Sequence, residues 1–338
     1  MTARARLIIL VVAVALLGTV AFASVMRASQ RAGERDTAQP GGPPVSAGSV
    51  SLAGSGRMVF RNMAWGPYRD DLVSVPVGDP GGARVAAPVR CLRFYAAAGT
   101  GVCLRKEDGA LQETYFASIL DSGLRTLREF PVGGIPTRTR VSPSGHMAAW
   151  TVFVGGDSYA GSNFSTRTSI VDTRTWELTS SLEAYTIIKD GRPYHAADVN
   201  FWGVTFSDDG HFYATLATKG QTYLVRGDIA ARTVTTMRTN VECPSLSPDG
   251  TRLVFKKRVP GADPDEPWRL YALDLKTMEE TPLAESRSVD DQVVWSDEHT
   301  VMYGLAGDYG DDLWSVPADG PGAARRVALA ALNPAFIG

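Results

Sequence analysis

Four stretches of the chain share one pattern, in which two runs of alternating apolar and polar residues flank a short polar turn. They are residues 139–153, 204–217, 244–257 and 293–306. Alternation with a period of two predicts half-buried β-strands, and a turn of the Ser-Pro-Asp-Gly type predicts a tight hairpin between them. The turn residues that define this repeated hairpin are Ser142, Gly145, Ser207, Gly210, Ser247, Asp249, Gly250 and Ser296.

A second internal match sets the number of repeats. DLVSVPVGDPGGAR (71–84) and DLWSVPADGPGAAR (312–325) align without a gap. From Arg57 to the C-terminus there are 282 residues, or 47 for each of six repeats. Four strands in about 40–45 residues is the length of a propeller blade. The sequence therefore predicts an all-β protein, a six-bladed β-propeller with four antiparallel strands per blade, its blades at 57–87, 88–132, 135–183, 201–240, 241–288 and 289–330.

The C-terminal segment predicts how the ring closes. Blade one has no convincing innermost strand before Arg57, whereas LNPAFIG (332–338) resembles the start of the innermost strand near Cys243. Because an open array would leave two exposed sheet edges, we expect the C-terminus to supply the missing strand of blade one.

The N-terminal region is expected to lie outside this fold. Arg4 and Arg6 precede an apolar run from Leu7 to Met26. This run fits a signal peptide cut before Ser24, which the Ala-x-Ala site favours, and it is also long enough for an uncleaved membrane anchor. Both interpretations place the rest of the chain outside the cytoplasm, secreted or anchored by one helix. The predicted organisation is a signal peptide or anchor (1–27), a flexible, disordered linker (28–50) and the propeller (51–338).

Two of the three cysteines fit an exported protein. Cys91 and Cys103 flank a hairpin turn that the sequence centres near Ala97, which would place them opposite each other within disulfide range. We expect them to form a disulfide, with two buried thiols as the alternative. Cys243 is then left over, as a buried apolar residue.

The charge balance excludes one class of partner. Lys and Arg total 34 and Asp and Glu 36, a formal net charge of −2. A nucleic-acid partner requires a concentrated basic surface, so we expect none.

The Ser247-Pro248-Asp249-Gly250 hairpin and its degraded copies, together with the six-repeat arithmetic and the export segment, resemble the TolB-type six-bladed β-propeller family, a WD-repeat-like group. The resemblance covers about residues 50–338 and implies the fold. Its members include periplasmic partners of the Tol-Pal machinery and propellers attached to prolyl-peptidase-like hydrolases. The separate N-terminal α/β domain of TolB has no expected counterpart in this chain. The resemblance by itself carries no chemistry.

No catalytic constellation is apparent in the sequence. Gly156–Ala160 is the nearest match to a nucleophile elbow, but no helical pattern follows it. We therefore expect no enzyme activity, no cofactor and no bound metal. The alternative is a propeller enzyme, a metal-dependent hydrolase or lyase at the channel mouth, with His195, Asp190 and Asp198 as candidate ligands.

Loop length points to a binding face. The long segments, 154–167, 183–200, 258–267 and 306–312, all fall where second-to-third loops and blade connections lie, on one face of a propeller. We expect them to form a crown over the channel mouth. The protein is then a monomeric, exported module that binds an unidentified envelope or extracellular protein. The binding-face residues are Asp157, Tyr159, Asn163, Arg167, Asp190, Arg192, His195, Asp198, Trp202, Asp263, Asp265 and Asp308.

Overall fold

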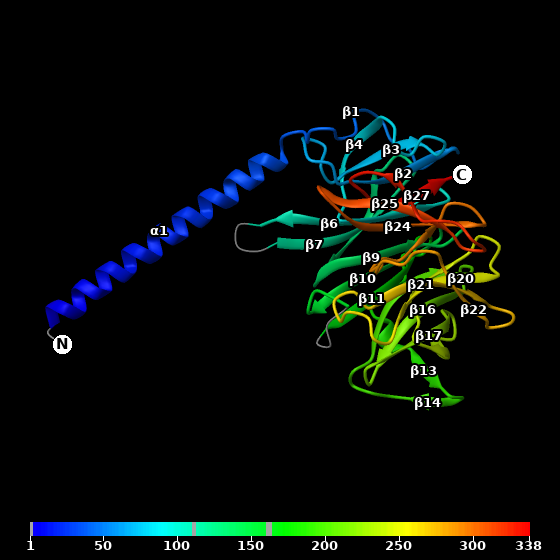
Figure 1. The fold of residues 1–338 in the computed structure, drawn as a ribbon. Coiled ribbons are helices and arrows are strands. Elements are labelled where there is room, and N and C mark those ends of the chain that lie inside the picture. Colours follow the sequence, from blue (N-terminus) through cyan, green and yellow to red (C-terminus); the bar gives the residue numbers. More distant parts are fainter. Residues whose placement is uncertain (1–2, 110–112, 160–163) are drawn as a thin grey trace.

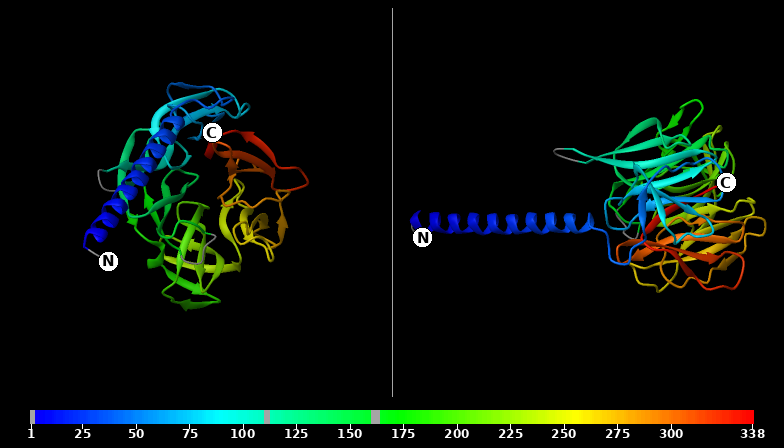
Figure 2. Two further views of the ribbon diagram at one scale, coloured as in Figure 1. Left: turned by 60° about the vertical axis from the view of Figure 1, so that its left-hand side comes forward. Right: turned by 90° about the horizontal axis from the view of Figure 1, so that it is seen from above.

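The computed structural model describes residues 3–109, 113–159 and 164–338. Within them the chain forms six sheets that are arranged around a central axis, with a long helix projecting from one side (Figures 1 and 2). Each sheet contains one blade of four antiparallel strands running from the axis outward, and in blades two to six these four strands are consecutive in the chain. The predicted six-bladed propeller is confirmed.

Blade one is closed by the C-terminus, as the sequence predicts. Its innermost strand is β27 (Ala331–Ile337), which pairs antiparallel with β2 (Arg57–Asn62). Beyond β2 lie β3 (Asp71–Pro76) and β4 (Arg84–Arg90). The apolar side chains of β27 supply the reason for this pairing, because Leu332, Ala335 and Ile337 are buried.

The other five blades follow in chain order. In blade two the strands are β5 (Arg93–Ala97), β6 (Thr100–Asp108), β7 (Glu113–Leu120) and β8 (Thr126–Val132). In blade three they are β9 (Ile135–Val141), β10 (Met147–Gly155), β11 (Ser165–Asp172) and β12 (Leu178–Thr179). In blade four they are β15 (Asn200–Phe206), β16 (His211–Thr218), β17 (Gln221–Asp228) and β18 (Thr233–Thr239).

Blades five and six complete the ring. In blade five the strands are β19 (Glu242–Leu246), β20 (Arg252–Arg258), β21 (Trp268–Asp274) and β22 (Glu280–Pro282). In blade six they are β23 (Val294–Trp295), β24 (Thr300–Gly307), β25 (Gly310–Pro317) and β26 (Arg325–Ala328). We call the face with the second-to-third loops and the blade connections the upper face, and the opposite face the lower face.

The repeated turns form on the lower face in the expected way, with one difference. Ser142 and Ser247 each accept a hydrogen bond at Oγ from the backbone five residues on. Gly145 and Gly250 have positive φ angles of 80° and 72°, which a side chain would disfavour. Gly210 does not have a positive φ, because the Asp208 carboxylate accepts hydrogen bonds from the backbone of this turn instead.

Two blades carry extra outer strands. β1 (Val45–Ala47) pairs parallel with β4 of blade one. The 3₁₀ helix η1 (Leu182–Ala184) leads to β13 (Thr186–Lys189), which pairs parallel with β18 of blade four and antiparallel with β14 (Arg192–Tyr194). In both cases the parallel pairing starts at the first residue of the blade's fourth strand, Arg84 of β4 and Thr233 of β18.

The N-terminal helix is longer than its apolar run. α1 extends over Ala3–Arg35, and the apolar side chains from Leu7 to Met26 are exposed. The Gly66 amide, in the β2–β3 loop on the upper face, donates to the Arg35 carbonyl over 2.8 Å. The helix therefore leaves the propeller from the upper face, on the side to which the β6–β7 hairpin also projects (Figure 2). Part of the predicted flexible linker lies on the propeller instead, as β1 and the buried Val50.

The Cys91–Cys103 disulfide is present, with a Cα–Cα distance of 5.3 Å. Its register differs from the expected one, because the hairpin turns at Ala98 and Gly99 and Cys103 pairs with Phe94. Cys91 therefore lies on the connection before β5. Cys243 is buried and not part of a disulfide, and burial raises the pKa of its thiol.

Candidate functional site

The β10–β11 loop holds the first group of predicted binding residues. Asp157 is exposed on the upper face, whereas Tyr159 turns inward and is only 2% exposed. Arg167 is exposed on β11. Asn163 lies outside the described residues. The loop thus contributes an aromatic side chain to the interior as well as polar side chains to the surface.

The segment 183–200 does not form a crown over the channel mouth. Half of it is the β13–β14 hairpin, which extends the outer edge of blade four, far from the axis (Figure 1). Asp190 and Arg192 lie in this hairpin and His195 is exposed beyond it. The reason is apolar burial, because this segment contributes Tyr185 and Ile187 to a core between blades three and four.

Asp198 is the residue of this segment that returns to the upper face. Its carboxylate accepts hydrogen bonds from Thr218 Oγ1 (2.8 Å) and from the Lys219 backbone (2.5 Å). These hydrogen bonds lower the pKa of Asp198. It therefore fixes the β16–β17 turn of blade four, beside the axis.

Two other predicted loops differ in length. Asp263 and Asp265 are exposed in the β20–β21 loop, which is long as expected. The predicted long segment 306–312 is instead a tight hairpin, in which Gly307 pairs with Gly310 and Asp308 is exposed at the tip.

A hollow of about 320 Å³ opens on the upper face where blades three, four and five meet. One wall is aromatic: the Tyr159 and Trp202 ring centroids are 5.0 Å apart, and Phe164 lies 5.4 Å from each of them. The polar residues around it are Asp198, Asn200, Thr218, Lys219, Gln221, Thr222, Glu242 and Arg258. Aromatic walls with a few convergent polar groups are typical of ligand sites.

Glu242 and Arg258 form the polar end of the hollow. Arg258 Nε donates to Glu242 Oε1 over 3.0 Å, and the guanidinium lies 5.0 Å from the Trp268 ring centroid. Glu242 is buried, and among the described residues its Oε2 has no hydrogen-bond partner. Within the same part of the chain, the buried indole N–H of Trp202 also lacks an acceptor. Buried polar atoms of this kind are rare and mark places where a further donor or acceptor fits.

Beneath the hollow lies a fully buried lysine. Lys256 Nζ is 3.8 Å from the Trp268 ring centroid and 4.8 Å from that of Tyr159. It is 3.8 Å from Glu242 Oε2 and donates a short hydrogen bond to Asp290. A buried cation requires such a setting of carboxylates and ring faces.

The segment 290–293, which precedes β23 of blade six, crosses the channel below, where it is hydrogen-bonded to three other blades. Arg138, on β9 of blade three, donates to the Asp290 carbonyl (3.2 Å) and carboxylate (3.4 Å). Arg140 donates to the Val293 carbonyl over 3.2 Å, and Gln292 donates to carbonyls of Val204 and Pro244 in blades four and five. We call residues 290–293 the plug.

Charges of both signs line the channel beside the plug. Burial and the nearby Arg138 lower the pKa of Arg93 to about 10. Burial and the nearby Asp291 raise the pKa of Asp311. The interior of this propeller is therefore ionic and hydrogen-bonded.

Several of these residues were not singled out by the sequence. Arg138 and Arg140 come from a Thr-Arg-Thr-Arg run, in which the period of two puts both arginines on the same side of the innermost strand. Lys256 and Arg258 also lie two residues apart, on β20, the second strand of blade five, within a Lys-Lys-Arg run. Charged residues at alternate positions of an inner strand are the signal that could have found them.

The candidate metal ligands of the alternative enzyme do not form a cluster. Over the part of the chain that the structure describes, no three His, Cys, Asp or Glu side chains are grouped so that they could hold a metal ion. Asp190 pairs with Lys189 on the outer hairpin, whereas Asp198 binds the β16–β17 turn.

No family model matches the sequence, and no curated protein does. The structure is similar to TolB from Acinetobacter baumannii, with a TM-score of 0.53, 17% identity, and coverage of 83% of this chain and 66% of that one. It is similar to a chain of the nidogen/laminin complex, with a TM-score of 0.50, 9% identity, and coverage of 83% and 98%. A puromycin-hydrolyzing peptidase from Mycobacterium tuberculosis has a TM-score of 0.48, 12% identity, and coverage of 82% and 46%.

The fold is thus that of a six-bladed β-propeller with antiparallel four-stranded blades. Within that class it is similar to the propeller of TolB, and this chain spans about two thirds of the length of that protein. The resemblance inferred from the Ser-Pro-Asp-Gly repeats is confirmed at the level of the fold.

Proposed function

We propose that this protein is a membrane-anchored binding module of the cell envelope, which holds a polypeptide ligand in the upper-face hollow. The observation that carries the proposal is the hollow itself, with an aromatic wall and the partly unpaired Glu242 at its polar end. The plug crosses the channel below, so the hollow is a site for binding at the mouth and not the entrance to a passage.

The membrane attachment is supported by the helix. α1 is the helix of the described residues that is long and apolar enough to span a bilayer, and it runs without a break through the Ala21–Ala23 cleavage motif to Arg35. A continuous helix favours the uncleaved anchor, because the hydrogen bond to Gly66 and the strand β1 join its C-terminal end to blade one. The upper face is then turned toward the membrane.

A photocrosslinking experiment tests the ligand site. A photoreactive residue replaces Gln221, which is exposed at the hollow, in the full chain expressed in its native envelope. We expect a specific crosslinked partner, and we expect Arg258→Ala to reduce its yield by tenfold or more.

The matched control carries the photoreactive residue at Arg226, which is exposed on the same strand, away from the hollow. Equal crosslinking from both positions, or a yield that does not change with Arg258→Ala, would refute the proposal.

A further inference from the structure

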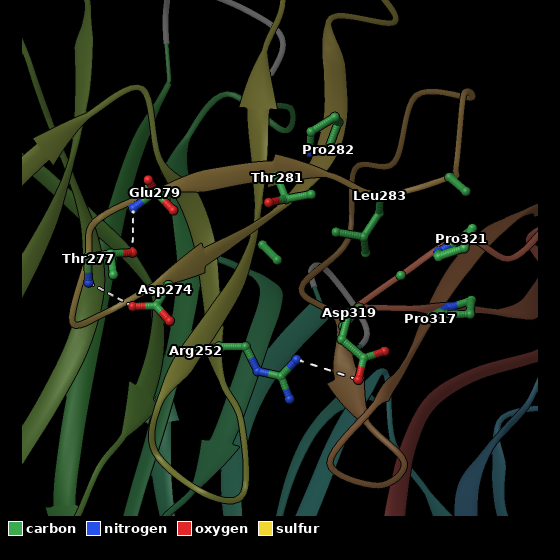
Figure 3. A pocket seen from close by; sticks show the side chains of 14 residues that line it. Arg252, Asp274, Thr277, Glu279, Thr281, Pro282, Leu283, Pro317, Asp319 and Pro321 are labelled. Carbon is green, nitrogen blue, oxygen red and sulfur yellow. Dashed lines mark hydrogen bonds and ion pairs between the residues drawn. The ribbon is translucent and has the colours of Figure 1, made fainter.

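A larger hollow than the one on the upper face lies on the lower face, between blades five and six. It measures about 630 Å³ (Figure 3). One wall is formed by Ala272 and the segment 281–284 of blade five, and the other by the turn 317–321 that leads to β26. Arg252 and Asp319 face each other across it, with their nearest charged atoms 3.8 Å apart. We call this hollow the 5–6 groove.

The groove between blades three and four is its structural equivalent. Asp172 and Asp274 each accept a backbone hydrogen bond four residues on, from Trp176 and Met278. Asp172 is therefore equivalent to Asp274, and Ile170, two residues earlier, is equivalent to Ala272. The backbone hydrogen bonds on the lower face also match. The Ile229 amide donates to the Gly210 carbonyl in blade four, and the Ala318 amide donates to the His299 carbonyl in blade six. The two grooves therefore occupy the same position in successive blade pairs.

The groove between blades three and four is filled by the chain itself. Leu182, Tyr185 and Ile187 are buried there, together with Met147 and Ile170. The hollow that is left measures about 330 Å³. The backbone of the filling segment adds a parallel strand to the outer edge, where Thr186 donates to the carbonyl of Arg232 and Thr186–Ile188 pair with Thr233–Thr235.

A second internal segment shows the same docking mode. β1 adds in parallel to the start of β4, where Arg84 donates to the Pro44 carbonyl and Gly48 donates to the Ala86 carbonyl. Val45 packs there against the apolar residues of blades one and six. Parallel addition to the first residues of an outer strand thus occurs twice in this molecule.

At the equivalent position in blade six, no strand from the described residues is added. Ser74 pairs with Val85 and its repeat equivalent Ser315 pairs with Arg325, so the residues equivalent to 84–86 are 324–326. Arg325 and Arg326 belong to β26, which is the outermost strand of its sheet. The edge is open, and the 5–6 groove beside it lacks the apolar filling that its equivalent contains. An open strand edge is a template for main-chain pairing with another segment.

The charges at this edge indicate the chemistry of the occupant. Arg325 and Arg326 are both exposed at the start of β26, where Arg326 lies 3.4 Å from the Asp312 carboxylate. Within the groove, Arg252 stands where its equivalent has Met147, while Ala272 replaces Ile170 and leaves room. Asp274 and Glu279 also line the groove, at the β21–β22 turn of blade five. The site thus combines space for a bulky apolar side chain with arginines at the strand edge of blade six.

We propose that the 5–6 groove is a strand-docking site for an extended, acidic segment of a partner protein. The segment adds in parallel to residues 324–326 and inserts a large apolar or aromatic side chain between blades five and six, as Tyr185 does between blades three and four. This site is on the opposite face from the proposed ligand hollow and does not depend on it.

The test uses the chain's own filling segment as a probe. The labelled nonapeptide SLEAYEIIE has the sequence of residues 181–189 with Thr186→Glu and Lys189→Glu. We expect it to bind the full protein in lipid nanodiscs with a Kd below roughly 100 µM by fluorescence anisotropy. The control peptide is N-methylated at the positions of residues 186 and 188, whose N–H groups make the strand pairing, and we expect its affinity to be at least about tenfold weaker.

A variant that fills the groove gives the second arm. A Cβ at Gly320 meets no atom within 4 Å, so Gly320→Trp introduces bulk into the groove without a clash at that position. We expect it to weaken peptide binding at least about tenfold. Gly133→Trp is the matched control, since its Cβ position is equally open and it does not line the groove.

Charge reversal gives the third arm. We expect Arg325→Glu with Arg326→Glu to weaken binding of SLEAYEIIE and to spare the parent peptide SLEAYTIIK. The proposal is overturned if SLEAYEIIE does not bind, if Gly320→Trp and Gly133→Trp bind it equally, or if the N-methylated peptide binds as well. It is also overturned if the protein without peptide dimerises and Gly320→Trp abolishes the dimer, because a second copy is then the occupant.

Discussion

Arg138 in blade three reaches across the axis of the propeller to Asp290, ahead of blade six, with 3.4 Å between its Nη2 and the carboxylate. Blades three and six lie on opposite sides of the ring. The same guanidinium lies 5.1 Å from the ring centroid of Tyr159, at the back of the upper hollow. One side chain therefore joins the plug, the ligand hollow and two opposite blades.

Replacing this side chain should loosen the plug. We expect Arg138→Met to lower the free energy of unfolding by about 1–3 kcal/mol, because it removes a buried partner of Asp290 while Lys256 still compensates that charge. Chemical denaturation measures the change. Arg226→Met, at an exposed position of β17, is the control and should alter stability by less than about 0.5 kcal/mol. Equal effects of the two variants would contradict the role of Arg138.

Removing the C-terminal strand should open the ring. A chain that ends at Leu332 loses most of β27, including the buried Ala335 and Ile337, and exposes the inner edge of β2. We expect a loss of about 5 kcal/mol or more from lost apolar burial and strand pairing. Differential scanning calorimetry gives the melting temperature. A chain that lacks only Gly338, outside β27, is the control, and an unchanged melting temperature for the longer truncation would disprove closure by the C-terminus.

The disulfide should contribute measurably to stability. Cys91 and Cys103 are separated by 12 residues, and closing a loop of this length in the unfolded chain is worth about 3 kcal/mol. We expect the double variant Cys91→Ser, Cys103→Ser to lose roughly that amount in urea denaturation. Reducing agent should destabilise the parent protein and leave the double variant unchanged. If reduction affects both proteins equally, the disulfide is not the source of the stability.

The pH dependence of stability should reveal Asp311. Burial and the nearby Asp291 raise its pKa in the folded state above the ordinary value of 3.8. The folded protein then binds this proton more tightly than the unfolded chain does. The contribution of Asp311 to the free energy of unfolding is therefore fully present below pH about 4. It is lost as the pH rises through the raised pKa. We expect Asp311→Asn to stabilise the protein at pH 7.

The comparison of two pH values isolates that effect. At pH about 3 the aspartic acid is protonated in both states, so the variant and the parent protein should have similar stability. Asp308→Asn, at the exposed tip of the same hairpin, is the control and should have little effect at either pH. A destabilised Asp311→Asn variant at pH 7 would show that the pairing of this carboxylate with Arg93 and Arg61 outweighs its burial.

The fold could be predicted because it is a repeat. Ser142 and Ser247 stand at the same place in two hairpins, and a local device that recurs along the chain gives both the strand type and the number of blades. Closure by β27 followed from the same count, since one innermost strand was missing. These features depend on interactions that are short in sequence or imposed by the ring.

The site could be predicted only in part. Tyr159, Asp198 and Trp202 were expected at the mouth and line the hollow there. Their partners Lys256 and Glu242 lie on strands that the sequence pattern predicts only as part of the core. That these residues come together depends on how three blades converge at the axis, which a single sequence does not show. The prediction for segment 183–200 was wrong. Its length suggested an exposed loop over the channel mouth, but burial of Tyr185 and Ile187 places it in the groove between blades three and four.

If α1 spans a bilayer, as we propose, its attachment at Gly66 limits the size of what can reach the upper face. Nine residues of helix separate Met26, at the end of the apolar run, from Arg35, and at 1.5 Å per residue they span roughly 14 Å. With α1 in a bilayer, this stalk is shorter than the diameter of even a small folded domain. The space between the membrane and the propeller then acts as a size filter, which admits an extended segment or a single helix and excludes globular proteins.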